Sequence, residues 1–86
     1  MNYHVTWRPS AEQQLAQLWI NATDRNAITD AANTIAADLA RDPLGVGESR
    51  SGATRFYFVS PLAVYYPVDS PNRQVHVWAV WRRRSP

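Results

Sequence analysis

The spacing of apolar residues changes once along this chain, and that change limits the folds the chain can adopt. Between Ala11 and Leu39, apolar residues recur at intervals of three and four, which is the spacing of one helix face. Between Arg55 and Trp81 they alternate with a period of two, which is typical of strands. A stretch at 43–53 that holds all three glycines separates the two regions. This order predicts an α+β protein with its helices before most of its sheet.

Two helices are predicted in the first half. Ser10 is a suitable N-cap for the first helix, and Gln13 three residues later completes a capping-box pattern. The polar stretch 21–23 ends this helix. The second helix is expected to begin after the N-cap Asp24 and to end before Pro43, because the residue preceding a proline is disfavoured in the α conformation. Two helices joined by so short a turn form a hairpin.

Four strands are predicted, at 3–7, 55–59, 63–68 and 74–81. The last three are joined by short turns, so we expect them to be antiparallel neighbours. Pro67 cannot donate to a strand ladder and should lie beside a bulge or an unpaired stretch. The predicted fold is α+β, in the order β-α-α-β-β-β. A two-helix hairpin packs on one face of a small, mostly antiparallel sheet, and residues 1–86 form a single domain. The other face stays open, and function is expected there.

The composition excludes several classes of site. The 86 residues contain no cysteine, which rules out disulfides, zinc-thiolate sites and thiol nucleophiles. The two histidines lack the spacing of a metal site, and no Gly-rich stretch lies between a strand and a helix, so we expect no metal and no small-molecule cofactor. The N-terminus lacks a signal-peptide pattern and no apolar run approaches a membrane span. These features favour a cytoplasmic protein.

Positive charge is concentrated in the second half of the chain. All nine basic residues are Arg and six of them lie between Arg50 and Arg84, whereas five of the seven acidic residues lie in the first half. Such a basic half favours an anionic partner, nucleic acid or an acidic protein segment. We expect Arg55 and the run Arg82–Arg84 to lie at the same end of the sheet and to converge on one anion. A solvated surface cluster is the alternative.

The aromatic residues are expected to divide between the core and the open face. Trp19 lies on the apolar face of its predicted helix and should be core. Trp78 and Trp81 fall on opposite faces of the last strand, as do Tyr65 and Tyr66 of the strand before it. One member of each pair is therefore expected on the open face, where exposed rings can stack on single-stranded RNA.

Several segments in order resemble RelE/ParE toxins of bacterial type II toxin–antitoxin pairs. They are the Thr6-Trp7-Arg8-Pro9 exit from the first strand, Ala11-Glu12-Gln13-Gln14-Leu15, the Asp42-Pro43-Leu44 helix exit, Val64-Tyr65-Tyr66-Pro67-Val68-Asp69, and Val75-His76-Val77-Trp78-Ala79-Val80-Trp81-Arg82-Arg83. The resemblance covers essentially the whole chain and rests on the order and spacing of these segments. It implies a toxin that binds a small acidic antitoxin.

Members similar to RelE cleave mRNA in the ribosomal A site without a metal, using basic residues to hold the phosphate while the 2′-hydroxyl attacks. By position, the resemblance assigns phosphate binding to Arg55 and to Arg83 or Arg82, and it puts Glu48 or Arg50 near the loop where relatives carry a carboxylate base. Further candidates for contact with RNA or a partner are Arg84, Trp81, Tyr57, Tyr66 and His76.

The chain also departs from that pattern. Leu62 stands where the family usually has Arg, and the sequence ends at Pro86, before the C-terminal Tyr or His-Tyr pair of the family. A short member with slow RNA cleavage is therefore expected, since loss of a general acid or base costs about 10²–10⁴ in rate. Three alternatives remain open: a DNA gyrase poison like ParE, a degenerate toxin that only binds its antitoxin, and a simple binder of single-stranded RNA.

Overall fold

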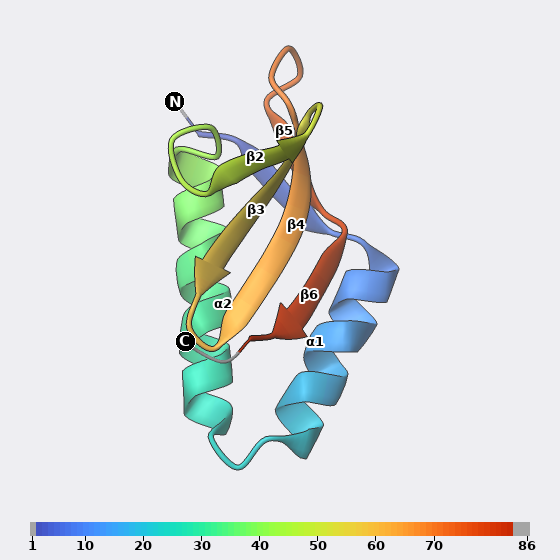
Figure 1. Cartoon of the computed structure of the whole chain (residues 1–86), viewed down its shortest axis with the longest axis vertical. Helices are drawn as coiled ribbons and strands as arrows, with labels where there is room; N and C mark the ends of the chain where they lie inside the picture. Colours follow the sequence, from blue (N-terminus) through green and yellow to red (C-terminus); the bar gives the residue numbers. More distant parts are fainter. Residues whose placement is uncertain (1, 84–86) are drawn as a thin grey trace.

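The computed structural model describes residues 2–83, which form two helices and one sheet (Figure 1). In chain order the elements are β1 (His4–Trp7), α1 (Pro9–Asn21), α2 (Arg25–Arg41), β2 (Glu48–Ser51), β3 (Thr54–Val59), β4 (Leu62–Asp69), β5 (Gln74–Val77) and β6 (Ala79–Arg82). None of the helices in this part of the chain is long and apolar enough to span a membrane.

The sheet has the strand order β1-β5-β4-β3-β2, and β6 pairs with β4 beyond the end of β5. Only β1 and β5 run parallel; every other pair is antiparallel. Strands β5 and β6 continue one another and are separated by Trp78. Tyr65 pairs with Ala79, and Val68 pairs with Val75. Between these two pairs, two residues of β4 lie opposite three residues of the continuous stretch formed by β5 and β6. This is a bulge, and Pro67 lies in it as predicted.

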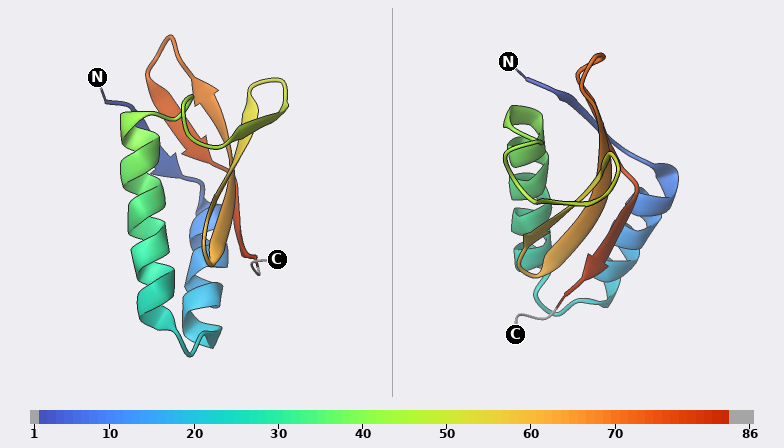
Figure 2. Two further views of the ribbon diagram at one scale, coloured as in Figure 1. Left: turned by 60° about the vertical axis from the view of Figure 1, so that its left-hand side comes forward. Right: turned by 45° about the horizontal axis from the view of Figure 1, so that its top comes forward.

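Both helices cover the same face of the sheet (Figure 2). The residues that join the two layers are fully or almost fully buried: Ala11 from α1, Ile28, Ala31, Ile35 and Leu39 from α2, and Leu62, Val64, Tyr66, Val75, Val77 and Val80 from the sheet. Burying each large aliphatic side chain contributes about 1.5–3 kcal/mol, so this layer is the main source of stability. The predicted α+β arrangement, with two helices on one face of a mostly antiparallel sheet, is confirmed.

The single strand predicted at 74–81 is interrupted at Trp78 and forms β5 and β6. Two further details differ from the sequence-based prediction. The predicted loop at 43–53 contains a strand, β2, which forms a hairpin with β3 through a turn at Gly52, whose φ is 57°. All four residues of β2 are exposed and polar, so the strand has no apolar alternation to reveal it. Helix α1 begins at Pro9 and not after Ser10. Proline has the φ of a helix already fixed and needs no donor at this first position, which makes a capping box unnecessary.

The outer edge of β6 lies beside α1. The backbone N–H of Val80 donates to Oε1 of Gln14 at 2.9 Å, so a helix side chain satisfies a strand group that has no neighbouring strand.

Candidate functional site

The pairing register decides which face of the sheet each arginine occupies. Residues directly opposite one another in an antiparallel pair point to the same face. Arg55 pairs with Tyr66, and Arg82 pairs with Leu62. Both partners are completely buried beneath the helices. Arg55 and Arg82 therefore belong to the helix-covered side, and the prediction that they lie on the open face is wrong.

Arg55 and Arg82 also lie at opposite ends of the sheet. Their partners Tyr66 and Leu62 are four residues apart along β4, which is about 13 Å at roughly 3.3 Å per residue. The first and third strands of a meander run in the same direction, so the start of one and the end of the other cannot share an end. The predicted convergence of Arg55 with Arg82 on one anion is therefore wrong.

Each of these two arginines has an internal partner. Nη2 of Arg55 donates to the backbone carbonyls of Leu44, Val46 and Gly47 at 3.1, 3.3 and 3.3 Å. The guanidinium of Arg82 donates through both terminal nitrogens to the carboxylate of Asp24, at 3.0 and 2.7 Å. These hydrogen bonds lower the pKa of Asp24.

Asp24 is the N-cap residue of α2, as predicted, but its side chain makes no capping hydrogen bond. Its carboxylate binds Arg82 instead, and this contact ties the end of β6 to the start of α2.

Three aromatic rings form a cluster on the open face. Phe56 and Tyr65 are paired across β3 and β4 with ring centres 5.9 Å apart, and Trp81 lies 4.9 Å from Tyr65 and 5.9 Å from Phe56. Phe56 is 5% exposed and Tyr65 is 38% exposed, so the cluster has a covered centre and an accessible rim. Beneath it Ala63, which pairs with Trp81, is completely buried.

Two arginines lie over this cluster from different elements. Cζ of Arg50, on β2, is 4.6 Å from the centre of the Phe56 ring. Cζ of Arg83, just after β6, is 5.3 Å from the same ring and 5.1 Å from that of Phe58. Both distances are within the range of cation–π attraction. Oε1 of Glu48 lies 3.5 Å from Nη2 of Arg50. We call Glu48, Arg50, Phe56, Phe58, Tyr65, Trp81 and Arg83 the open-face site.

The open-face site contains three of the five predicted catalytic residues, namely Glu48, Arg50 and Arg83. It also contains Trp81 among the residues predicted to contact RNA or a partner. Sequence reasoning missed Phe56 and Phe58. A usable signal was available. Arg55 is the strand partner of Tyr66, so placing Tyr66 in the core puts Arg55 on the same side of the sheet. Side chains alternate along a strand, and Phe56 and Phe58 therefore point to the opposite, open face.

Two predicted contact residues lie on the helix-covered side. The hydroxyl of Tyr57 donates to Oδ2 of Asp38 in α2 at 2.6 Å, and burial together with this carboxylate raises the pKa of Tyr57 to about 12. Tyr66 is completely buried, and its hydroxyl donates to the carbonyls of Pro43 and Val46 at 3.0 and 3.1 Å. Burial raises the pKa of Tyr66. Neither ring can stack on a ligand at the open face.

The remaining predicted residues lie elsewhere. His76 is half-buried in β5 on the open side, and its Nδ1 is 2.9 Å from Oγ1 of Thr6, away from the aromatic cluster. Trp78, at the bulge, is 44% exposed and near Arg8. Arg84 lies outside the described residues. Leu62, at the position where the resemblance led us to expect an Arg, is a core residue.

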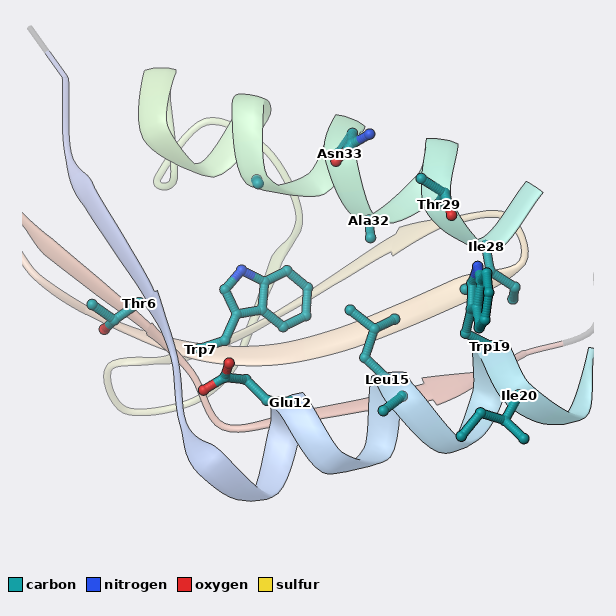
Figure 3. A pocket seen from close by; sticks show the side chains of 12 residues that line it. Thr6, Trp7, Glu12, Leu15, Trp19, Ile20, Ile28, Thr29, Ala32 and Asn33 are labelled. Atoms are coloured by element: carbon teal, nitrogen blue, oxygen red, sulfur yellow. The ribbon is translucent and has the colours of Figure 1, made fainter. Parts of the chain in front are cut away.

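A second surface lies between the two helices (Figure 3). Here Trp7, Leu15, Trp19, Ile28 and Ala32 line an apolar groove of about 810 Å³. Trp19, predicted to be core, is 43% exposed, and its side chain lines the groove near the turn that joins α1 to α2 (Figure 3).

One arginine covers part of this exposed wall. Cζ of Arg25 lies 4.6 Å from the centre of the Trp19 ring, and its guanidinium donates to the carbonyls of Trp19 and Ile20 at 3.0 Å each. Ile20, at the same end of the groove, is 55% exposed. Trp19 and Ile20 line the same groove, and a contiguous exposed apolar patch of this kind is typical of a surface that contacts another molecule.

Comparison with known proteins gives a fold and not a close relative. No protein-family model matches the chain, and no curated protein matches it. Among solved structures, a chain of the toxin–antitoxin complex RelBE2 from Mycobacterium tuberculosis is similar with a TM-score of 0.79 and 24% identity, over 96% of this chain and 100% of that one. A chain of the chromosomal ParDE system from P. aeruginosa has a TM-score of 0.74 and 13% identity, over 95% and 97% of the two chains.

The isolated RelE toxin from E. coli is similar as well, with a TM-score of 0.66 and 13% identity, over 98% of this chain and 87% of that one. The three structures match nearly the full length of this chain at low identity, so what they share with it is the arrangement of helices and strands. The chain has the fold of RelE/ParE toxins.

Proposed function

We propose that this chain is the toxin of a type II toxin–antitoxin pair and that its open-face site binds and cleaves ribosome-bound mRNA. The observation that carries this proposal is the position of two guanidinium groups, from Arg50 and Arg83, over one aromatic cluster with an exposed tyrosine. Guanidinium groups bind phosphate oxygens, and exposed rings stack on bases. The similarity in fold to the isolated RelE toxin and to a chain of the RelBE2 toxin–antitoxin complex supports the assignment as a toxin.

The site offers the groups needed for metal-independent cleavage. The 2′-oxygen of one nucleotide attacks the neighbouring phosphorus, the bond to the 5′-oxygen breaks, and a 2′,3′-cyclic phosphate forms. Glu48 accepts the proton of the 2′-hydroxyl, while Arg50 and Arg83 stabilise the charge that develops on the non-bridging oxygens. The 5′-oxygen takes a proton from water. The contact between Glu48 and Arg50 holds the proposed base beside the proposed phosphate ligand.

Growth and message integrity test this proposal. Production of the chain in bacteria should arrest growth and leave cuts within translated messages. The double variant Arg50→Ala, Arg83→Ala should allow growth and leave the messages intact. A control with the same change in charge, Arg73→Ala with Arg82→Ala, should still arrest growth, since neither residue belongs to the open-face site. Full arrest by the open-face double variant would contradict the proposal.

The apolar groove favours a second candidate function, that of a binding module. An apolar groove between two helices can take an amphipathic helix of a partner. We propose the cognate antitoxin as that partner, because two of the similar structures are described as toxin–antitoxin systems. If binding is the whole function, the chain forms a tight complex with its antitoxin and cuts no RNA.

A variant in the groove separates the two functions. Ile20→Asp puts a charge on an exposed residue of the groove wall and should weaken the complex with the antitoxin without changing RNA cleavage. The matched control is Gln17→Asp, which adds the same charge on the same helix outside this groove. Growth arrest with intact messages and with broken DNA would select the gyrase alternative over cleavage of mRNA.

A further inference from the structure

Strand β2, which carries Glu48 and Arg50, has little support of its own. Within residues 2–83 it forms one edge of the sheet and pairs only with β3, and all four of its residues are exposed. No apolar side chain of β2 reaches the core. The position of Arg50 over the aromatic cluster therefore depends on how the chain enters β2, through residues 43–47.

Two side chains of the sheet hold this entry segment from below. Arg55 donates from one nitrogen to the carbonyls of Leu44, Val46 and Gly47, and the hydroxyl of Tyr66 donates to those of Pro43 and Val46. Four of the five residues of the segment thus have their carbonyl oxygens bound by these two side chains. No carboxylate among residues 2–83 forms an ion pair with Arg55.

Gly47 shows how closely the segment lies against the sheet. A Cβ at this position would lie 2.4 Å from the carbonyl oxygen of Phe56 and 2.8 Å from the hydroxyl of Tyr66, and φ is +69°. The last residue before β2 is therefore in direct contact with the strand that carries the aromatic cluster. The Nε atom of Arg55 is buried and has no hydrogen-bond partner among residues 2–83.

We propose that Arg55 is a positioning residue for the open-face site. It makes no contact with the ligand but fixes the segment 43–47, and through it the strand that places Arg50 over Phe56. The role of Arg55 then differs from the direct phosphate contact expected from the sequence. This inference rests on the proposed function only for the binding measurement described next. Its structural consequence, the loosening of β2, can be measured without a ligand.

The binding measurement is a double-mutant cycle with a short oligouridylate as the probe. Arg55→Gln should weaken binding by roughly threefold or more, which is the size expected for loss of one exposed ion pair. Because Arg55 acts through Arg50, the double variant Arg55→Gln, Arg50→Ala should bind no more weakly than Arg50→Ala alone. The effects of Arg55→Gln and Arg83→Ala should add. Arg73→Gln removes the same charge far from the site and should leave binding unchanged.

Amide hydrogen exchange supplies the second measurement. In Arg55→Gln the protected amides of the β2–β3 pair should exchange faster, while those of the β4–β6 pair should keep their wild-type rates. Additive effects of Arg55→Gln and Arg50→Ala would overturn the inference, and so would unchanged exchange in β2. If the wild-type chain fails to bind the oligouridylate, the proposed function fails, and the exchange measurement still decides the role of Arg55.

Discussion

The salt dependence of RNA binding tests the assignment of charges to the two faces of the sheet. Binding that neutralises phosphates releases counterions, so the logarithm of the binding constant falls linearly with the logarithm of salt concentration, with a slope of about −0.7 per phosphate contact on single strands. Arg50 and Arg83 lie over the open-face cluster, whereas Arg82 is paired with Asp24 on the other side. Replacing either open-face arginine by Ala should therefore make the slope less steep by about 0.7.

The expected effect is large enough to measure. Between 50 and 200 mM salt, two phosphate contacts account for about a sevenfold loss of affinity, and one contact for about 2.6-fold. Fluorescence anisotropy of a labelled oligouridylate, recorded at four or more salt concentrations, gives the slope for each variant. Arg50→Ala and Arg83→Ala should each change it by the same amount, and the double variant by twice that amount.

Arg82→Ala is the matched control, because it removes the same charge one position from Arg83. Its slope should equal that of the wild-type chain, since Arg82 lies on the helix-covered side and both of its terminal nitrogens donate to Asp24. The reasoning would be refuted if Arg82→Ala reduced the slope as much as Arg83→Ala, or if Arg50→Ala left it unchanged. Either result would mean that RNA does not bind across the aromatic cluster.

Three further predictions concern the free energy of unfolding, which urea denaturation measures in each case. Folding raises the pKa of Tyr57 from 10.0 to about 12, so the unfolded chain loses this proton at a lower pH than the folded chain does. The free energy of unfolding should therefore fall as pH rises from 10 through 12. In Tyr57→Phe this fall should be shallower. The pKa of Asp24 is lowered by its hydrogen bonds with Arg82, so this contribution is present above pH 3.8 and is lost as pH falls through the folded-state value. Asp24→Asn should be less stable than wild type at neutral pH, and the difference should vanish in acid. Gly52→Ala should destabilise by about 1 kcal/mol for its positive φ alone, whereas Gly47→Ala should cost a further 1–3 kcal/mol or so, because its Cβ has no space; equal losses would contradict this.

The sequence predicted the elements well where a local rule decides the outcome. Pro43 ends the second helix because the α conformation is disfavoured just before a proline, and α2 does end at Arg41. Tyr65 and Tyr66 separate onto two faces because strand side chains alternate. The open face of the sheet and the two-helix layer follow from the same alternation and the same helical spacing.

The positions of charged side chains were harder to predict, since they depend on contacts far apart in the sequence. Arg55 alternates in phase with core residues, a position normally given to an apolar side chain. It is accommodated because its long side chain reaches backbone carbonyls 8–11 residues earlier. Arg82 is bound by an acid 58 residues away. Trp19 is 43% exposed although it lies on the apolar face of its helix, since the helical pattern of one segment contains no information on how its neighbours cover that face.

The polar edge strand β2 also bears on how the chain behaves when it is produced alone. An unpaired strand edge is a template for strands of other molecules, and charged side chains are a common protection against such growth. Glu48 and Arg50 place two charges on this exposed edge of four residues. Replacing both with apolar β-formers should then promote association between copies of the chain. Two of the residues proposed to act on RNA should therefore also oppose extension of the sheet into a larger assembly.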